Sequence, residues 1–361
     1  MKEKWYRYKR VGGWHFVKAF PLHCHSITYR ISNTSNPHLK MASYTSSILI
    51  TGGTQGLGFH CAKVIAQQCP TSLIVVASRT DPDNSAAEIN KALKQSNVKY
   101  MSLDLGSHAT VRTFVQNWKA ANHPPIQALV LNAAIQLPGD IEYTPDGIEK
   151  TFGINHLGHA LLFHLLAGEL KGDARIVVTA SGTHDPAQKS GLHTHYTSAA
   201  DVARPSAESI KKSYGRGRYA TSKLANVLWT YALARHLSAL PGKSQTVTAM
   251  DPGLMPGTNL ARSVALLNWL ANNVLTHTLW LLKLLLRTKN VHLPAESGVA
   301  LARLAVGEDV KGQTGKYFEG LKEIGSSVQS LDVRLQDELW EWTIEEAAQE
   351  RAEAERFRRG E

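Results

Sequence analysis

Residues 48–58 read Ile-Leu-Ile-Thr-Gly-Gly-Thr-Gln-Gly-Leu-Gly, a short apolar run followed at once by a turn rich in glycine. The apolar run predicts a buried strand. Gly52, Gly56 and Gly58 let the backbone turn tightly and approach a phosphate group at the start of a helix, where the helix dipole favours negative charge. A strand, a glycine-rich turn and a helix in this order are typical of a dinucleotide-binding unit.

The same rhythm of short apolar runs and helix-length intervals continues along the chain. The further runs are at residues 73–77, 98–103, 128–131, 176–178 and 247–249, with a last expected strand near 315–318. Such runs predict a parallel sheet that is covered by helices on both faces. We therefore expect a doubly wound α/β fold of the Rossmann type, as a single catalytic domain over residues 43–325.

A second stretch, residues 219–223, reads Tyr-Ala-Thr-Ser-Lys. Tyr219 and Lys223 are four residues apart, so they lie on one face of a helix. The pKa of an isolated tyrosine is about 10, and a cation one turn away favours the phenolate and lowers that pKa. Ser181 ends the run that starts at Arg175, where its hydroxyl could hold a substrate carbonyl. The combination predicts a nicotinamide-dependent oxidoreductase.

The charge at the end of the second strand bears on the choice of cofactor. An NAD-binding chain often carries an acid there, about 20 residues after the glycine-rich turn, to hold the ribose 2′-hydroxyl. This chain has Ser78-Arg79 instead. Arg79 can pair with a 2′-phosphate, so we expect NADP(H) to be the cofactor.

Two insertions interrupt the rhythm, and we expect them to form a lid on the substrate side. Residues 183–214 are polar and are interpreted as a surface excursion over the site. Their His193-Thr194-His195 triplet has no acidic or cysteine partner spaced beside it, so we expect no metal site. Residues 258–292 include the apolar stretch 264–286, but Asn268 and Lys283 interrupt it, which argues against a transmembrane span. Its helices could be core, could cover a hydrophobic substrate, or could contact a membrane surface peripherally.

The formal charge of +10 is concentrated at the start of the chain. Residues 1–40 carry a net +7, and the other residues carry only +3, so we expect no nucleic-acid partner. We interpret residues 1–42 as a basic extension that is disordered or lies upstream of the true start at Met41. An organellar address and a basic arm that touches anionic lipid or nucleic acid are the alternatives.

The other end of the chain, residues 326–361, predicts one charged amphipathic helix with Leu335, Leu339 and Trp342 on its apolar side. The three cysteines form no Cys-x-x-Cys pair, which indicates a reducing compartment. We therefore expect a cytoplasmic protein, with membrane association through residues 264–286 as the alternative.

Across about residues 46–320 the chain resembles the short-chain dehydrogenase/reductase superfamily. The cofactor residues that this resemblance implies are Thr51, Gly52, Gly56, Leu57, Gly58, Ser78, Arg79, Asp104, Leu105, Asn132, Ala133, Tyr219, Lys223, Pro252, Gly253 and Thr258. The catalytic residues that it implies are Ser181, Tyr219, Lys223 and Asn155.

The residues 155–159, Asn-His-Leu-Gly-His, and 222–228, Ser-Lys-Leu-Ala-Asn-Val-Leu, are similar to retinol dehydrogenases and protochlorophyllide reductases. Two features depart from the family pattern. Ala134 replaces a usual Gly, and Ser181 lies farther before Tyr219 than in compact members, which makes transfer of a substrate from any relative unsafe.

The resemblance implies that NADPH passes a hydride to the carbonyl carbon of a fairly hydrophobic small molecule. Tyr219 then donates the proton, Ser181 orients the oxygen, and Lys223 lowers the pKa of Tyr219 and holds the nicotinamide ribose. Asn155 would anchor a water that refills the proton. Reduction of a carbon–carbon double bond and a non-catalytic NADP(H)-binding scaffold are the alternatives. A homodimer is the assembly that the family suggests.

Overall fold

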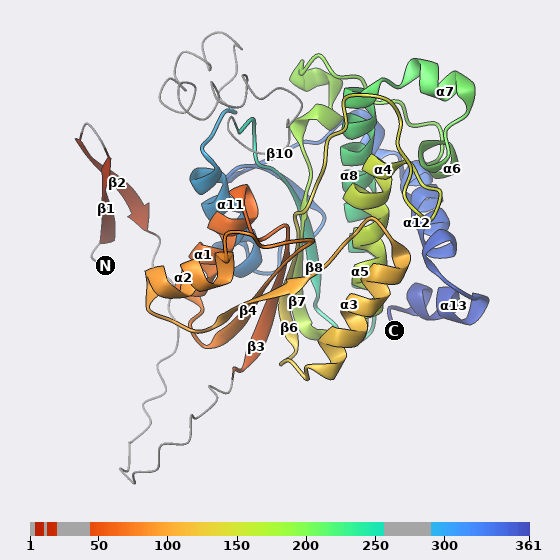
Figure 1. The fold of residues 1–361 in the computed structure, drawn as a ribbon. Helices are drawn as coiled ribbons and strands as arrows, with labels where there is room; N and C mark the ends of the chain where they lie inside the picture. Colours follow the sequence, from red (N-terminus) through yellow and green to blue (C-terminus); the bar gives the residue numbers. More distant parts are fainter. Residues whose placement is uncertain (1–3, 11–12, 20–43, 256–289) are drawn as a thin grey trace.

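The computed structural model describes residues 4–10, 13–19, 44–255 and 290–361, and its main body is built on one sheet (Figure 1). The strand order is β10-β9-β8-β7-β6-β3-β4-β5. All neighbours are parallel except β9 and β10. The strands are β3 Ser46–Thr51, β4 Ser72–Ser78, β5 Val98–Ser102, β6 Ile126–Leu131, β7 Leu170–Thr179, β8 Thr246–Asp251, β9 Lys316–Glu319 and β10 Lys322–Ile324.

The expected doubly wound α/β architecture is confirmed. From β3 the chain moves outward through β4 to β5 and then returns to the other side of β3 as β6. In sheets of this kind, ligands bind in the crevice outside the carboxyl ends of the strands, at the point where the order reverses. The fold therefore places a site at the carboxyl ends of β3 and β6.

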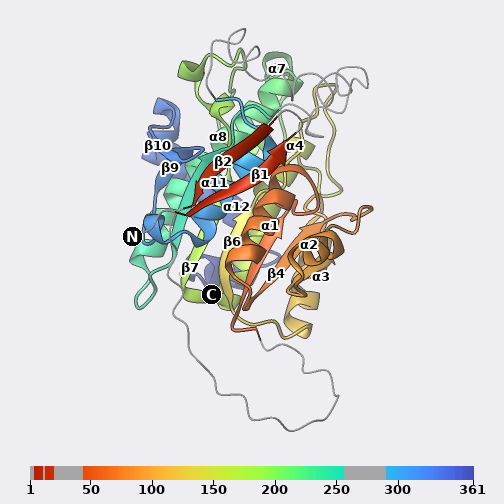
Figure 2. The ribbon, with the colours of Figure 1, turned by 90° about the vertical axis from the view of Figure 1, so that its left-hand side faces the viewer.

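Helices cover both faces of the sheet, as Figures 1 and 2 show. One face carries α1 Gly56–Gln68, α2 Ser85–Leu93 and α11 Pro294–Val306, and the other carries α3 His108–Ala120, α5 Gly158–Leu166 and α8 Gly215–Ala239. Successive strand residues alternate between the two cores: Ile48 and Ile50 pack against α1 and α11, and Leu49 packs on the other side. This burial on both faces explains why the strands read as continuous apolar runs.

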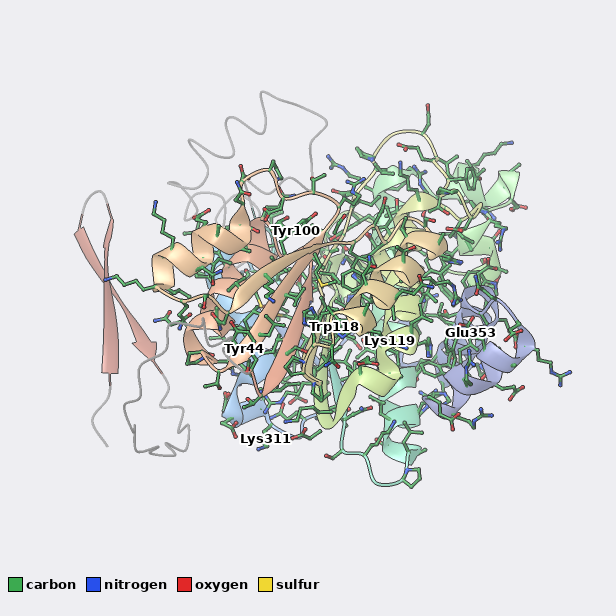
Figure 3. All side chains as sticks on the ribbon, turned by 60° about the horizontal axis from the view of Figure 1, so that its bottom comes forward. Tyr44, Tyr100, Trp118, Lys119, Lys311 and Glu353 are labelled. Carbon is green, nitrogen blue, oxygen red and sulfur yellow. The ribbon has the colours of Figure 1, made fainter. Side chains whose placement is uncertain are left out.

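Shorter elements join these layers. They are α4 Lys150–Phe152, η1 Gly153–Leu157, η2 Ala167–Glu169, η3 Gly182–His184, η4 Pro186–Gln188, α6 Ala199–Ala203, α7 Ala207–Lys212, η7 Glu308–Val310 and η8 Val328–Leu331. Figure 3 looks from the amino ends of the strands, where Tyr44 precedes β3 and Lys311 precedes β9. The candidate site lies at the opposite end.

The prediction of one C-terminal helix over residues 326–361 is wrong. The segment after η8 forms two helices, α12 Val333–Ala347 and α13 Arg351–Arg359, and Figure 3 labels Glu353 on the second. Arg112 of α3 fixes the bend, because its guanidinium donates to the Ala347 carbonyl at 2.8 Å and to both carboxylate oxygens of Glu353 at 2.7 Å. Leu339 is fully buried as expected.

In the amino-terminal region, Lys4–Arg10 (β1) pairs antiparallel with Gly13–Ala19 (β2). The sequence did not predict these two strands, because residues 1–42 show no regular apolar pattern. The remainder of the expected extension lies outside the described residues, and so do residues 258–289 of the second insertion with its apolar stretch. Within the described part of the chain, no helix combines the length and the apolar character needed to cross a membrane.

Candidate active site

The residues expected at the site come together at the carboxyl edge of the sheet. Thr51, Ser78 and Asp251 end β3, β4 and β8, and Asn132 follows β6 directly. Ser181 lies two residues beyond the end of β7. The expected residue Thr258 lies outside the described residues.

The glycine-rich turn has the backbone that its sequence predicts. Gly52 and Gly56 have φ of +64° and +54°, values that side chains rarely adopt. A Cβ on Gly58 would lie 2.2 Å from the Gly52 carbonyl oxygen, so only glycine allows the first turn of α1 to pack on the loop. A Cβ on Gly56 would meet nothing within 4 Å, which leaves open space before the helix. The loop is a cradle of the kind that holds a pyrophosphate.

Thr51 joins β3 to β6 at the bottom of this cradle. Its hydroxyl oxygen accepts the backbone N–H groups of Asn132 at 2.8 Å and Ala133 at 3.0 Å. The Asn132 side chain donates to the Thr51 carbonyl at 2.9 Å. These bonds fix the two strand ends on either side of the point where the strand order reverses.

The adenine side of the expected cofactor site is more open. The Thr54 hydroxyl donates to the Ser78 hydroxyl at 3.1 Å, and the side chain of the adjacent Arg79 is exposed. Asp104 accepts the Gly106 N–H at 2.9 Å, and Leu105 is buried against Gly158 of α5.

Ser181, Tyr219 and Lys223 form one cluster, in which Tyr219 and Lys223 are buried and Ser181 is half-buried. Tyr219 and Lys223 lie on the same side of α8, with the Lys223 Nζ 5.6 Å from the centroid of the Tyr219 ring. The Tyr219 phenol hydrogen-bonds to the Ser181 side chain. The ammonium group of Lys223 donates to the Thr179 carbonyl at 2.7 Å, which ties α8 to the end of β7.

The electrostatics of this cluster differ from the expectation that Lys223 lowers the pKa of Tyr219. Burial raises the pKa of the Tyr219 phenol, Asp251 raises it further, and the hydrogen bond with Ser181 opposes both. Burial also lowers the pKa of Lys223 to about 7, against the effect of Asp251. Desolvation is the largest effect on both residues and disfavours both charged forms.

Asn155 lies in η1, a π-helical turn between α4 and α5, where Gly158 N–H donates to the Gly153 carbonyl. Its side chain is fully buried and accepts the Ile135 N–H at 2.8 Å while donating to the Ile135 carbonyl at 3.0 Å and the Ser222 hydroxyl at 3.0 Å. Asn155 thereby links the chain after β6 to the helix that carries Tyr219. Such π-turns are frequent at functional sites.

His159 has a role that the sequence pattern did not indicate. Its Nδ1 donates to the Asn155 carbonyl at 3.2 Å, so its Nε2 accepts the Thr51 hydroxyl at 2.8 Å. Burial lowers the pKa of His159 to about 4, and it is neutral at pH 7. The spacing of four residues from Asn155 in one helix is the signal that could have identified this contact.

The insertion at residues 183–214 is more embedded than a surface excursion. His184 is buried, donates from Nδ1 to the Ser181 carbonyl at 2.7 Å and accepts the Ser327 N–H at 3.1 Å. Tyr196 is also buried, and its hydroxyl donates to Glu338 of α12 at 2.7 Å. The polar composition of the insertion hid these anchors. Among the residues that the structure describes, no group of histidine, cysteine and acidic side chains could hold a metal ion.

Asp251, Pro252 and Gly253 follow β8 beside this cluster. Pro252 is buried, its carbonyl accepts the Ser297 hydroxyl at 2.7 Å, and Gly253 has a φ of +77°. The Asp251 carboxylate is buried as well, although nothing in the sequence pattern assigned it a role.

Comparison with known proteins fits this geometry. Residues 46–200 match the family model described as short chain dehydrogenase. A short-chain dehydrogenase, TIC 32 B, chloroplastic, of Brassica napus is 32% identical over 304 residues, which cover 82% of this chain and 87% of that protein. The chain belongs to the short-chain dehydrogenase/reductase family.

Two other relatives of this short-chain dehydrogenase/reductase have named substrates. Polyprenol dehydrogenase of Danio rerio is 32% identical over 81% of this chain and 83% of its own length. Retinol dehydrogenase 14 of Mus musculus is 30% identical over 82% of this chain and 84% of its own length. The expected similarity to the retinol dehydrogenase branch is confirmed.

Solved structures show the same fold. A crystal structure of an uncharacterized protein from Mycobacterium Paratuberculosis matches with a TM-score of 0.57 and 22% identity, over 85% of this chain and 94% of that one. A blue fluorescent protein from a metagenomic library, in complex with NADPH, matches with a TM-score of 0.55 and 21% identity, over 78% of this chain and 99% of that one. The short-chain dehydrogenase/reductase family uses nicotinamide cofactors, and the protein is an oxidoreductase.

Proposed function

We propose that the protein is an NADP(H)-dependent enzyme that interconverts the carbonyl and alcohol groups of a fairly hydrophobic small molecule. The observation that carries the proposal is the cluster of Ser181 with the buried Tyr219 and Lys223 beside the glycine cradle. A proton donor, a hydroxyl that can orient an oxygen and a cation are the groups that carbonyl reduction requires.

The residues present fit a dinucleotide. The positive φ values of Gly52 and Gly56, and the open space before Gly56, suit a pyrophosphate at the amino end of α1. Arg79 is exposed at the end of β4, and among the described residues no carboxylate pairs with it. A 2′-phosphate would give this guanidinium a charge-assisted partner, which favours NADP(H) over NAD(H).

The protein residues divide the remaining work. NADPH, when bound, supplies the hydride to the carbonyl carbon. Ser181 holds and polarises the carbonyl oxygen, and Tyr219 gives its phenolic proton to that oxygen. Its raised pKa keeps the proton on the phenol before reaction, as a general acid requires. Lys223 holds the nicotinamide ribose, and Asn155 supports the proton supply by fixing the chain at Ile135 against α8.

The relatives guide the choice of substrate. Those named above are dehydrogenases of polyprenol and retinol, so we propose an apolar alcohol or carbonyl compound as the substrate here. Homodimer formation, a cytoplasmic location and peripheral membrane contact through residues 264–286 stay predictions. Membrane partition and molecular mass in solution are the measurements that test them.

The test is NADPH oxidation on a panel of aldehydes, ketones and enones graded by hydrophobicity. We expect turnover of apolar carbonyls, and we expect Tyr219→Phe to bind NADPH normally while kcat falls by about 10²- to 10⁴-fold, because only the proton donor is lost. Tyr214→Phe is the matched control, since Tyr214 is 47% exposed and precedes the same helix. Near-normal turnover by Tyr219→Phe would contradict the catalytic assignment. Turnover of enones alone would favour double-bond reduction.

A further inference from the structure

Asp251 places a carboxylate in the interior of the site. Its residue is 3% exposed at the end of β8. One carboxylate oxygen accepts the Gly253 N–H at 2.9 Å, and the other accepts the side-chain amide of Asn290 at 2.6 Å. These neutral donors fix the orientation of the carboxylate, but they do not neutralise its charge. A buried charge is costly unless hydrogen bonds and an opposite charge compensate it.

The carboxylate lies directly behind the strand end that carries Ser181. A Cβ on Gly182 would lie 2.8 Å from Asp251 Oδ2, so only a glycine fits between the carboxylate and the turn after Ser181. The residue before Asp251, Met250, accepts the Ala180 N–H at 2.7 Å, which aligns β8 with the end of β7.

The nearest buried cation in the cluster approaches the same strand end. Lys223 is 1% exposed, and its ammonium group donates to the Thr179 carbonyl, whose residue pairs with Met250 across the two strands. Within the described part of the chain, neither Asp251 nor Lys223 forms a close ion pair. The Asp251 carboxylate and the Lys223 ammonium therefore lie on either side of the carboxyl end of β7, and each can offset the cost of burying the other charge.

We propose that Asp251 is a positioning residue that keeps Lys223 protonated inside the active site. This inference rests on the proposed function, in which Lys223 must be a cation beside Tyr219. Asp251 lies behind Ser181 and acts through Lys223, without touching substrate or cofactor.

The other titratable groups around Asp251 do not take over this role. From η3 and the residue after it come His184, whose pKa burial lowers, and Asp185. From β9 come Tyr317, whose pKa is raised by burial and then by Asp251, and Glu319, whose pKa is raised in the same way. These neighbours are neutral or acidic near pH 7. Asp251 also opposes the lowering of the His184 pKa, but burial is the larger effect there and the imidazole stays neutral, so Lys223 is the facing base that can be a cation near pH 7.

Asp251 raises the pKa values of both Tyr219 and Lys223 on α8. Burial lowers the pKa of Lys223 to about 7, and Asp251 opposes that change. Asp251 adds to the effect of burial on Tyr219, whose pKa is raised. One carboxylate therefore favours both the charged lysine and the protonated tyrosine, which is the state that carbonyl reduction needs. His159, whose pKa is lowered by burial and also by Lys223, is neutral and does not supply a negative charge.

The direct test needs no turnover. In protein labelled with [¹³C]lysine, the Cε signal of Lys223 should titrate near pH 7, away from lysines with ordinary pKa values near ~10.4, and Lys223→Met identifies it. Asp251→Asn should move that titration midpoint downward by about one pH unit. An unchanged midpoint in folded Asp251→Asn protein would overturn the proposal.

Two companion variants separate charge from packing. Asn290→Leu removes the hydrogen bond to Asp251 but no charge, so its midpoint should move less than in Asp251→Asn. The double exchange Asp251→Asn with Asn290→Asp keeps a carboxylate and an amide in contact. It should return the Lys223 midpoint most of the way to the wild-type value, even if Asp251→Asn alone folds poorly. Equal shifts in Asn290→Leu and Asp251→Asn, or no recovery in the exchange, would show that packing is responsible and overturn the charge role.

Activity gives the functional counterpart. At saturating NADPH, the alkaline limb of kcat/KM for a carbonyl substrate should move to lower pH in Asp251→Asn, because Lys223 loses its proton earlier. A wild-type protein that reduces no carbonyl, while its Lys223 signal still shifts in Asp251→Asn, would contradict the proposed function and support the charge role. If the wild-type protein reduces carbonyls, and Asp251→Asn changes neither the pH profile of kcat/KM nor the Lys223 signal, the proposed function stands and the charge role is overturned.

Discussion

Arg79 is the side chain on which the choice between the two nicotinamide cofactors depends. It is exposed at the end of β4, beside the Thr54–Ser78 hydrogen bond. We expect Arg79→Glu to weaken NADPH binding roughly 10- to 100-fold relative to NADH, since a charge-assisted hydrogen bond becomes a repulsion. Fluorescence titration with both cofactors measures this ratio.

Arg351→Glu makes the same charge change on α13, outside the site, and should leave the ratio unaltered. If Arg79→Glu leaves the relative affinities of the two cofactors unchanged, the assignment of Arg79 is wrong.

At the scale of single residues, the sequence predicts groups that belong to a local pattern. The spacing of Tyr219 and Lys223 and the strand-end position of Ser181 were sufficient to bring them together. Asp251 and His184 have hydrogen-bond partners that are distant in the sequence, Asn290 and Ser327, so no local spacing indicated these contacts. The pKa of Tyr219 also could not be predicted, because it depends on burial.

At the scale of elements, the packing of α1 on the glycine loop can be tested at Gly58. An added Cβ would lie 2.2 Å from the Gly52 carbonyl oxygen and 2.7 Å from the Asn132 side-chain nitrogen. Gly58→Ala should therefore displace the loop, lower the free energy of unfolding by roughly 1–3 kcal/mol and weaken cofactor binding at least tenfold. Urea unfolding and NADPH titration measure the two effects.

The control is Gly168→Ala, where an added Cβ meets nothing within 4 Å and φ is not positive. It should change neither quantity measurably. Normal NADPH affinity in Gly58→Ala would show that the loop does not hold the cofactor.

The seven parallel strands were predictable because each is an apolar run bounded by turn residues. The break between α12 and α13 was not, since it depends on Arg112, more than two hundred residues earlier in the chain. The π-turn at Gly153–Leu157 was equally hidden, because residues 151–164 are all buried and no polar face marks the shift that its extra residue causes.

At the scale of the whole molecule, buried histidines make stability sensitive to acid. Burial lowers the pKa values of His156 and His164 to about 3 and that of His159 to about 4. A folded-state pKa below the unfolded value near 6.5 means that the unfolded chain binds more protons between the two values. The stabilisation is complete above about pH 6.5 and is lost as the pH falls toward 4 for His159 and toward 3 for the other two, by up to about 1.4 kcal/mol per pH unit for each residue.

Urea unfolding at pH 7 and pH 5 tests this dependence. His164→Leu should reduce the loss of stability between these values, because His164 Nε2 has no hydrogen-bond partner among the described residues and leucine does not titrate. The exposed His193→Leu is the matched control and should leave the loss unchanged. An identical loss in His164→Leu and wild type would contradict the account.

Hydride transfer from NADPH to an apolar carbonyl is the reaction proposed for the cluster of Ser181, Tyr219 and Lys223. It is tested most directly by incubating the protein with NADPH deuterated at the transferable C4 position and the apolar carbonyl panel, and then examining the products by mass spectrometry. We predict alcohols that carry one deuterium on the carbinol carbon with the wild-type protein and almost none with Tyr219→Phe. NADPH binding without deuterium in any product, or equal incorporation by Tyr219→Phe, would contradict the claim.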